Sequence, residues 1–91
     1  MESALLVRIE GRVTGVGFRY YTLQAAAGFP DLCGYVRNVG YGEVEVWLQG
    51  PESQVAEMLA WLRHGPSHAR VTDVTVSAVT PRSDLVSFTV E

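Results

Sequence analysis

The sequence predicts an α+β fold in which two helices cover one face of a single sheet. Two observations support this prediction. Stretches of alternating apolar and polar residues, typical of half-buried strands, flank two stretches whose apolar residues have helical spacing. The predicted elements follow the order β-α-β-β-α-β, with a short extra strand at the C-terminal end. Because β-α-β units make parallel strands with right-handed crossovers, two interleaved units give an antiparallel sheet in the ferredoxin-like sandwich.

The first strand and the first helix lie within residues 5–30. Residues 5–13 alternate between apolar and polar side chains and predict the strand. Apolar side chains at offsets of three, four and four then predict a helix; they are Phe18, Tyr21, Ala25 and Phe29. Gly28 and Pro30 end this helix, since a proline disfavours helical dihedral angles in the residue before it.

A hairpin follows the first helix. Residues 33–38 form its first strand, residues 39–42 its turn, and the alternating residues 44–48 its second strand. One face of such a sheet stays solvated, and we expect Tyr35 and Trp47 on that open face.

The remaining elements are a helix and two strands. Pro51 in the first turn and Glu52 near the positive end of the dipole mark the start of the helix. Its predicted apolar face consists of Val55, Met58, Leu59 and Leu62. Residues 64–66 end it, residues 74–78 make the next strand, and residues 86–90 make the short terminal strand.

Composition limits the classes of function. A chain of 91 residues predicts one domain, residues 1–91. The net charge of −3 disfavours nonspecific binding to nucleic acid or anionic membranes, which usually requires a basic excess. No apolar stretch has the length of a membrane helix, and the first residues lack the features of a signal peptide. Cys33 has no partner for an intrachain disulfide, so we expect a buried structural thiol and a cytoplasmic protein.

The stretch from Gly11 to Arg19 joins the first strand to the first helix and carries the candidate chemistry. Gly15 and Gly17 allow positive φ angles and a close approach of the backbone to a ligand. The free amides that open a helix, together with its dipole, attract anions. Arg19 adds a permanent charge with five donors, suited to phosphate oxygens. The loop alone is equally compatible with a strand–helix turn whose glycines only relieve strain.

Chain topology adds a second polar side chain to this loop. The first two strands are parallel in the predicted fold, so their C-terminal ends share one edge of the sheet. Arg19 follows the end of the first strand and Asn38 lies at the end of the second. Asn38 on its own is also typical of a turn, because asparagine tolerates left-handed dihedral angles.

These residues resemble the two-part signature of the acylphosphatase family. The first part is Gly11-x-Val13-x-Gly15-Val16-Gly17-Phe18-Arg19, and the second is Gly34-Tyr35-Val36-Arg37-Asn38. Further matches lie at residues 43–46, 50–51 and 65–71. The resemblance covers nearly the whole chain and is therefore more specific than the glycine loop. Departures are Thr14 where the family often has Gln, Tyr35 where Trp is common, and a slightly longer connection containing Pro30.

The resemblance implies the ferredoxin-like fold, no metal or cofactor, and hydrolysis of carboxyl-phosphate anhydrides. By the same resemblance Arg19 binds the phosphoryl group and Asn38 places the water. The implied phosphate cradle is formed by the backbone amides of Gly15, Val16, Gly17, Phe18 and Arg19. We expect inorganic phosphate to be a competitive product inhibitor, and we expect a monomer that binds neither nucleic acid nor membrane.

The chemistry of an acyl phosphate needs no general acid, because a carboxylate with a pKa of about 4 leaves without a proton at neutral pH. We therefore expect Glu43 and Glu45 to be solvent-side strand residues. We expect His64 and His68 to be surface residues at the end of the sheet opposite the loop. Neither pair is expected to take part in catalysis.

Two other functions stay open. The same loop would serve a ligand-binding or regulatory module that binds anions without turnover. A ferredoxin-like sheet also serves single-stranded RNA binding through stacked aromatic residues. Residues 44–48 lack the Lys/Arg-Gly-Phe pattern of that class, and the acidic net charge disfavours it.

Overall fold

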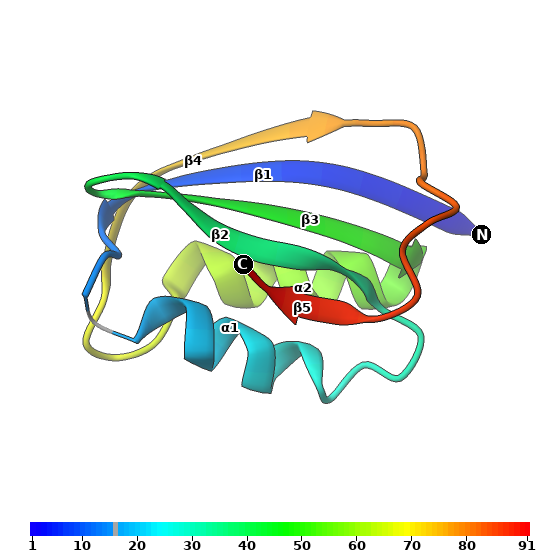
Figure 1. Cartoon of the computed structure of the whole chain (residues 1–91), viewed down its shortest axis with the longest axis horizontal. Coiled ribbons are helices and arrows are strands. Elements are labelled where there is room, and N and C mark those ends of the chain that lie inside the picture. Colours follow the sequence, from blue (N-terminus) through cyan, green and yellow to red (C-terminus); the bar gives the residue numbers. More distant parts are fainter. Residues whose placement is uncertain (16) are drawn as a thin grey trace.

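The computed structural model describes residues 1–15 and 17–91 and has two layers, a sheet and a pair of helices (Figure 1). Within these residues the elements come in the predicted order, with the ferredoxin-like arrangement confirmed. The helices and strands are β1 (Glu2–Arg12), α1 (Phe18–Ala26), β2 (Cys33–Gly40), β3 (Glu43–Pro51), α2 (Glu52–His64), β4 (Arg70–Ala78) and β5 (Phe88–Val90).

The strand order in the sheet is β4-β1-β3-β2-β5. β1 pairs with β3 and β4, and β2 pairs with β3, all antiparallel. β5 pairs with β2 in parallel, so the added strand makes the sheet mixed. Since β1 and β2 each run antiparallel to the β3 between them, they are parallel to each other. Their C-terminal ends therefore lie at the same edge, as the sequence predicts.

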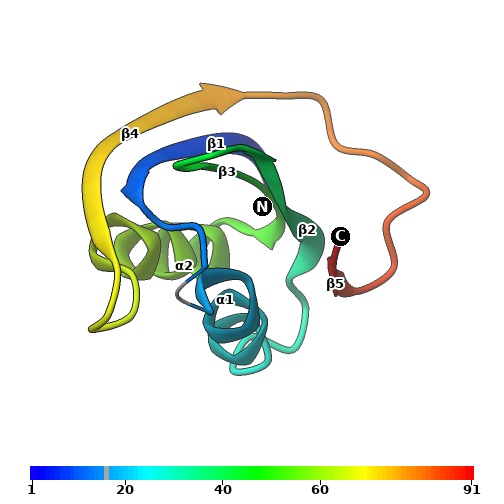
Figure 2. The same cartoon turned by 60° about the vertical axis from the view of Figure 1, so that its left-hand side comes forward.

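Both helices pack on one face of the sheet (Figures 1 and 2). The core between the layers is formed largely by valines from the strands and by apolar side chains from α2, with Val55, Met58 and Leu62 buried as predicted. In α1 the buried residues are Phe18, Thr22 and Ala26.

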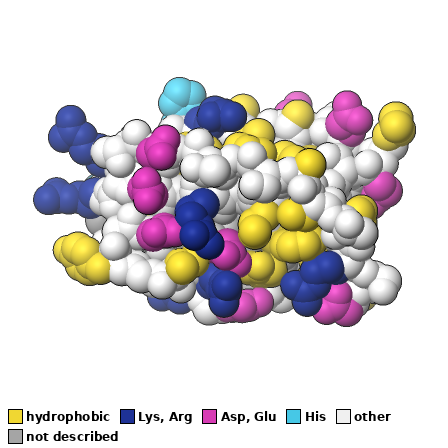
Figure 3. All heavy atoms as spheres, turned by 90° about the horizontal axis from the view of Figure 1, so that it is seen from above, with side chains coloured by type: hydrophobic (Ala, Val, Ile, Leu, Met, Phe, Trp, Pro, Cys, Tyr) yellow, Lys and Arg dark blue, Asp and Glu magenta, His cyan; other side chains and the backbone are white. Residues whose placement is uncertain are grey.

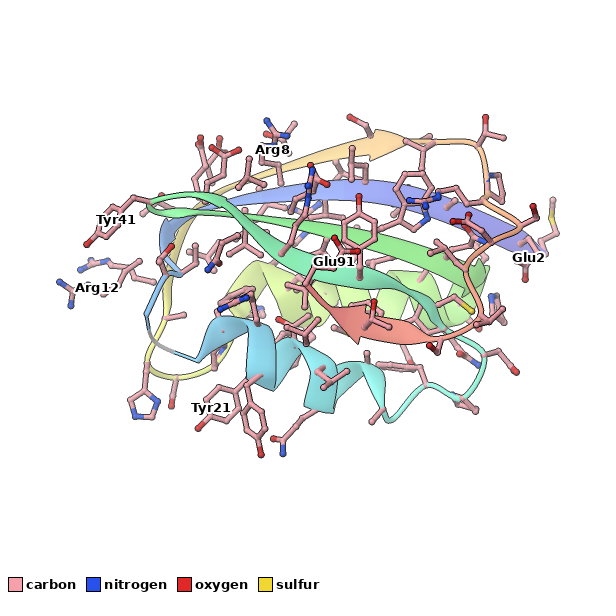
Figure 4. All side chains as sticks on the ribbon, in the orientation of Figure 1. Glu2, Arg8, Arg12, Tyr21, Tyr41 and Glu91 are labelled. Atoms are coloured by element: carbon pink, nitrogen blue, oxygen red, sulfur yellow. The ribbon has the colours of Figure 1, made fainter. Side chains whose placement is uncertain are left out.

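Tyr21, whose spacing helps to predict α1, does not face the core. Its side chain is exposed and points away from the sheet (Figure 4). Thr22 takes the inward position instead, one turn after Phe18, and is fully buried. Its Oγ1 donates to the Phe18 carbonyl oxygen at 2.8 Å, and this bond satisfies the hydroxyl within the core. The spacing of apolar residues that predicts this helix is therefore not the spacing of its buried face, because a polar side chain with a local partner also fits a core.

Tyr35 and Trp47 lie on the open face of the sheet, as expected. Their rings are stacked at 6.2 Å between centroids, and the Arg82 guanidinium lies 5.5 Å from the Trp47 ring centroid. Tyr35 is buried, so neither ring is an open platform for a nucleic-acid base. Cys33 at the start of β2 is half-buried rather than fully buried.

Charged side chains and an apolar patch share the open face (Figure 3). The charged part is organised around Glu45, which is only 5% exposed. Its carboxylate accepts from Tyr35 Oη at 2.7 Å, Arg37 Nε at 3.0 Å and Arg8 Nη2 at 3.3 Å. Glu45 is therefore on the solvent side of the sheet, as expected, but it is the buried centre of an ionic network.

The partners of Glu45 decide its charge. Burial by itself would raise the pKa of the Glu45 carboxyl, but the hydrogen bonds from Arg37 and Tyr35 outweigh burial and hold its pKa below the ordinary value of 4.5. Burial and the bond to Glu45 raise the pKa of the Tyr35 hydroxyl to about 12. Both shifts favour the ionised carboxylate and the neutral phenol at neutral pH.

Substitution of Glu45 is expected to destabilise the fold. Glu45→Gln removes the charge that pairs Arg8 and Arg37, and we expect a loss of about 1–3 kcal/mol in the free energy of unfolding at pH 7. A carboxyl with a lowered pKa in the folded state stabilises above its unfolded pKa, and that stabilisation is lost as the pH falls through the folded pKa. We therefore expect urea unfolding to show a smaller difference in the free energy of unfolding between Glu45→Gln and wild type at pH 3 than at pH 7.

Glu43→Gln is the matched control for this prediction. Glu43 pairs with the same Arg8, Nε to Oε2 at 2.9 Å, but its side chain is 25% exposed against 6% for Glu45. The more exposed pair is worth less than about 1 kcal/mol. Equal losses in the free energy of unfolding for the two substitutions would show that the buried network around Glu45 stabilises the fold no more than the exposed pair of Glu43 and Arg8.

Candidate active site

A pocket of about 410 Å³ opens where β1 ends and α1 begins. It brings together residues from the loop after β1, from α1, from the end of β2 and from β5. The lining residues are Val13, Gly15, Gly17, Phe18, Arg19, Tyr20, Leu23, Asn38 and Val90. Every site residue expected from the sequence lines this pocket except Val16, which lies outside the described residues.

The two loop glycines adopt the positive φ angles that the sequence predicts, 75° at Gly15 and 74° at Gly17. Gly17 is the N-cap of α1, and its carbonyl oxygen accepts the first helical bond, from Tyr21 N at 3.0 Å. Among the described residues no side chain caps this end, and the first turn contains no acidic residue. The first amides of α1 therefore remain available to an anion, at the positive end of the helix dipole.

Arg19 lies in the first turn of α1, half-buried at the edge of the same pocket. Its Nη1 donates to the main-chain oxygen of Glu91 at 2.7 Å, while Glu91 N donates to Val36 O at 2.9 Å. Figure 4 shows Glu91 in front of the strands, and Figure 2 shows the C-terminal end beside β2. One of the five guanidinium donors thus ties the helix to the C-terminal segment, and the others, which have no hydrogen-bond partner among the described residues, suit the oxygens of a ligand.

Asn38 reaches the pocket because of its register. Alternation along β2 puts Asn38 on the same face as the buried Val36, which is the face covered by the helices. The pairing with β3 then shifts, so that Asn38 is opposite Val44 and Gly40 is opposite Glu43. Such a bulge bends a strand end and redirects side chains, and bulges are common beside active sites.

Thr14 makes a hydrogen bond to the backbone of a distant turn, which the sequence did not reveal. Its Oγ1 accepts a hydrogen bond from Gly42 N at 3.0 Å, and Gly11 N donates to Gly42 O at 3.1 Å. These bonds join the end of β1 and the loop after it to the turn between β2 and β3. Labelled side chains of Arg12 and Tyr41 lie together at this end of the molecule (Figure 4). The hairpin that carries Asn38 is thereby fixed to the loop that carries the glycines.

Loss of the Thr14 hydroxyl is expected to loosen this connection. Thr14→Val keeps the shape but leaves Gly42 N without its acceptor, at a cost of about 1 kcal/mol in the free energy of unfolding. Thr14→Ser keeps the acceptor and serves as the control. Thermal unfolding and phosphate titration of the two variants measure the effect. Equal stability and equal phosphate affinity in Val and Ser variants would show that the bond does not support the loop.

The longer connection with Pro30 lies at the other end of the sheet, beside the end of β3. Asp31 N donates to Gln54 Oε1 of α2 at 3.1 Å, and a Cβ on Gly50 would lie 2.6 Å from Asp31 O. The connection is thus anchored far from the loop after β1. Arg19 and Asn38 still line one pocket.

The expected position of His64 and His68 is wrong. α2 runs back toward the end of the sheet where α1 begins, so the connection after it lies beside the loop after β1. A Cβ on Gly65 would lie 2.9 Å from Phe18 Cε2, and Arg70 pairs with Arg12. Both histidines are nonetheless exposed, as expected, and neither lines the pocket.

Two features are absent from the part of the chain that the structure describes. No group of three or more His, Cys, Asp or Glu side chains is placed to hold a metal ion. Neither described helix is long and apolar enough to cross a membrane.

An α+β sandwich with an uncapped helix N-terminus, an arginine and an asparagine around one pocket has the features of a candidate active site for an anionic substrate. The acylphosphatase family model matches residues 5–90. An acylphosphatase of Burkholderia thailandensis is 55% identical over 69 residues, which are 76% of this chain and 69% of that protein. The chain belongs to the acylphosphatase family.

Solved structures support the same assignment. The crystal structure of an acylphosphatase from Bacillus subtilis matches with a TM-score of 0.89 and 30% identity, covering 100% of this chain and 99% of that one. An acylphosphatase from Coxiella burnetii matches with a TM-score of 0.90 and 30% identity, covering 99% and 93% of the two chains.

Proposed function

We propose that the chain hydrolyses acyl phosphates with Arg19 and the loop amides binding the phosphoryl group and Asn38 positioning the attacking water. Acyl phosphate hydrolysis is the activity that the family's name states, and this proposal assigns its parts to residues. The observation that carries the proposal is the shared pocket, in which the open N-terminus of α1, Arg19 and Asn38 surround one space.

The phosphoryl oxygens bind at the N-terminus of α1, where backbone amides and the Arg19 guanidinium provide donors and positive charge. These groups stabilise the charge that the transferring phosphoryl group carries in the transition state. Positioning and charge stabilisation are the main contributions that proteins make to phosphoryl transfer.

Asn38 places the water on the side of phosphorus opposite the acyl oxygen. An oxygen lone pair of the water forms the new bond to phosphorus, and the phosphorus–acyl oxygen bond breaks with its electron pair on the carboxylate. The proton released by the water passes to a phosphoryl oxygen, so the products are a carboxylate and dihydrogen or monohydrogen phosphate. The leaving carboxylate needs no proton, because its pKa is about 4.

The decisive experiment is hydrolysis of benzoyl phosphate at neutral pH in excess chelator. We expect rapid hydrolysis, with competitive inhibition by inorganic phosphate because product and substrate share the helix N-terminus. A folded protein that binds phosphate without turnover would contradict the enzyme and favour a ligand-binding module on the same fold. A binding assay with single-stranded RNA at low salt tests the other alternative, and we expect no binding.

A further inference from the structure

The candidate active site continues beyond the phosphate-binding loop into an apolar section. Leu23, Tyr20 and Val90 line the same pocket as Arg19 and Asn38. Leu23 is one helical turn beyond Arg19 on the same side of α1, about 6 Å farther from the loop along the helix axis. The pocket therefore has a polar end at the start of α1 and an apolar end farther along the helix.

The opposite wall of the apolar end comes from β5, which lies beside α1 (Figures 1 and 2). Val90 pairs with Val36 and is 40% exposed, although it lines the pocket. The segment is held in place on both sides, since Glu91 N donates to Val36 O and Arg19 Nη1 donates to Glu91 O. These bonds fix Val90 opposite the helix.

Tyr20 forms the outer edge of this apolar end. Its side chain is 57% exposed, and its Oη accepts a hydrogen bond from Gln24 Nε2 at 2.7 Å. The ring also contacts Tyr21 edge to face, with centroids 5.5 Å apart. These contacts fix the position of an exposed aromatic ring whose residue lines the pocket.

We propose that Leu23, Val90 and Tyr20 form a subsite for the acyl group and give the enzyme a preference for aromatic or long apolar acyl phosphates over acetyl phosphate. This inference rests on the proposed function, because a phosphoryl group bound by Arg19 directs the acyl group along α1. An acetyl group is too short to cover these side chains. Each additional methylene that is buried against them is worth about a four-fold gain in affinity.

The test compares benzoyl phosphate with acetyl phosphate in wild type, Leu23→Ala and Val90→Thr. Val90→Thr keeps the β-branched shape that suits a strand and makes the surface polar. We expect wild type to have the higher kcat/KM for benzoyl phosphate. In both variants the ratio of the two kcat/KM values falls at least about five-fold, mainly through KM for benzoyl phosphate.

Val86→Thr is the matched control. Val86 lies in the same C-terminal segment, is 87% exposed and does not line this pocket. The control should keep the wild-type ratio. If Val90→Thr and Val86→Thr give the same ratio, or if both substrates fall equally in Val90→Thr, the acyl subsite is wrong. Should Leu23→Ala fail to fold by circular dichroism, Val90→Thr alone decides.

Phenylphosphonate and methylphosphonate separate this inference from the proposed function. Both present a phosphonyl group that resists hydrolysis, and calorimetry measures their binding without turnover. We expect phenylphosphonate to bind wild type more tightly and to lose that advantage in Val90→Thr. Wild type that hydrolyses neither acyl phosphate would overturn the proposed function. Wild type that hydrolyses both equally, and binds both phosphonates equally, would overturn only the acyl subsite.

Discussion

Arg19→Gln is expected to lower kcat/KM for benzoyl phosphate by about 10³-fold or more and to weaken inhibition by phosphate. The substitution removes the only side-chain cation among the described residues that line the pocket. In the proposed function, ground-state phosphate and the transition state both carry the charge that Arg19 neutralises, so substrate binding and turnover fall together. Steady-state kinetics and phosphate titration, with circular dichroism to check folding, measure the two losses.

Two further variants make this prediction specific. Arg12→Gln removes the same charge from the other flank of the loop, where Arg12 is exposed and outside the pocket, and we expect less than about a three-fold effect there. Arg19→Lys keeps the charge but replaces a planar fork by a point donor, which gives a loss between those of wild type and Arg19→Gln. Equal losses of kcat/KM in Arg12→Gln and Arg19→Gln would mean that Arg19 acts only through the overall electrostatic field of the protein and not through contact with the substrate.

The fold was predictable because local signals and topology agree. Alternation marked the strands, and Val55, Met58 and Leu62 marked the inner face of α2. The parallel pairing of β5 with β2 was not predictable, because a strand of three residues is too short to indicate which strand it pairs with or in which direction. The buried face of α1 could not be predicted from apolar spacing, because Thr22 satisfies its hydroxyl locally and lies in the core where the larger Tyr21 does not.

The candidate site was predictable to the level of its loop and its two polar side chains. Chain order alone places Arg19 and Asn38 at one edge of the sheet, and the structure brings both to one pocket. The bond from Gly42 N to Thr14 Oγ1 and the tie from Arg19 to Glu91 were beyond prediction, since each joins segments far apart in the chain. Such contacts depend on the register and the bulge of β2, which no local pattern reveals.

Asn38→Ala is expected to lower kcat for benzoyl phosphate by about 10²-fold while most of the affinity for phosphate is kept. Asn38 lines the pocket from the end of β2, whereas the proposed phosphoryl site lies at the start of α1, so in the proposed function its amide acts on the water rather than on the anion. An interaction made only with the attacking water lowers kcat and kcat/KM equally when it is lost. Steady-state kinetics with phosphate as a competitive inhibitor measure both quantities in one assay.

Asn38→Gln tests whether the position of the amide matters for kcat as well as its hydrogen-bonding groups. Glutamine keeps both donor and acceptor but moves them by one methylene, and a displacement of about 1 Å in such a site costs up to about 10²-fold. The neighbouring Val39, which is exposed and does not line the pocket, provides Val39→Ala as the control for changes in the bulge. Wild-type kcat in Asn38→Ala would remove Asn38 from the mechanism. A parallel loss of phosphate affinity would instead place its amide on the phosphoryl oxygens, beside Arg19, and leave the water to be positioned by the substrate itself.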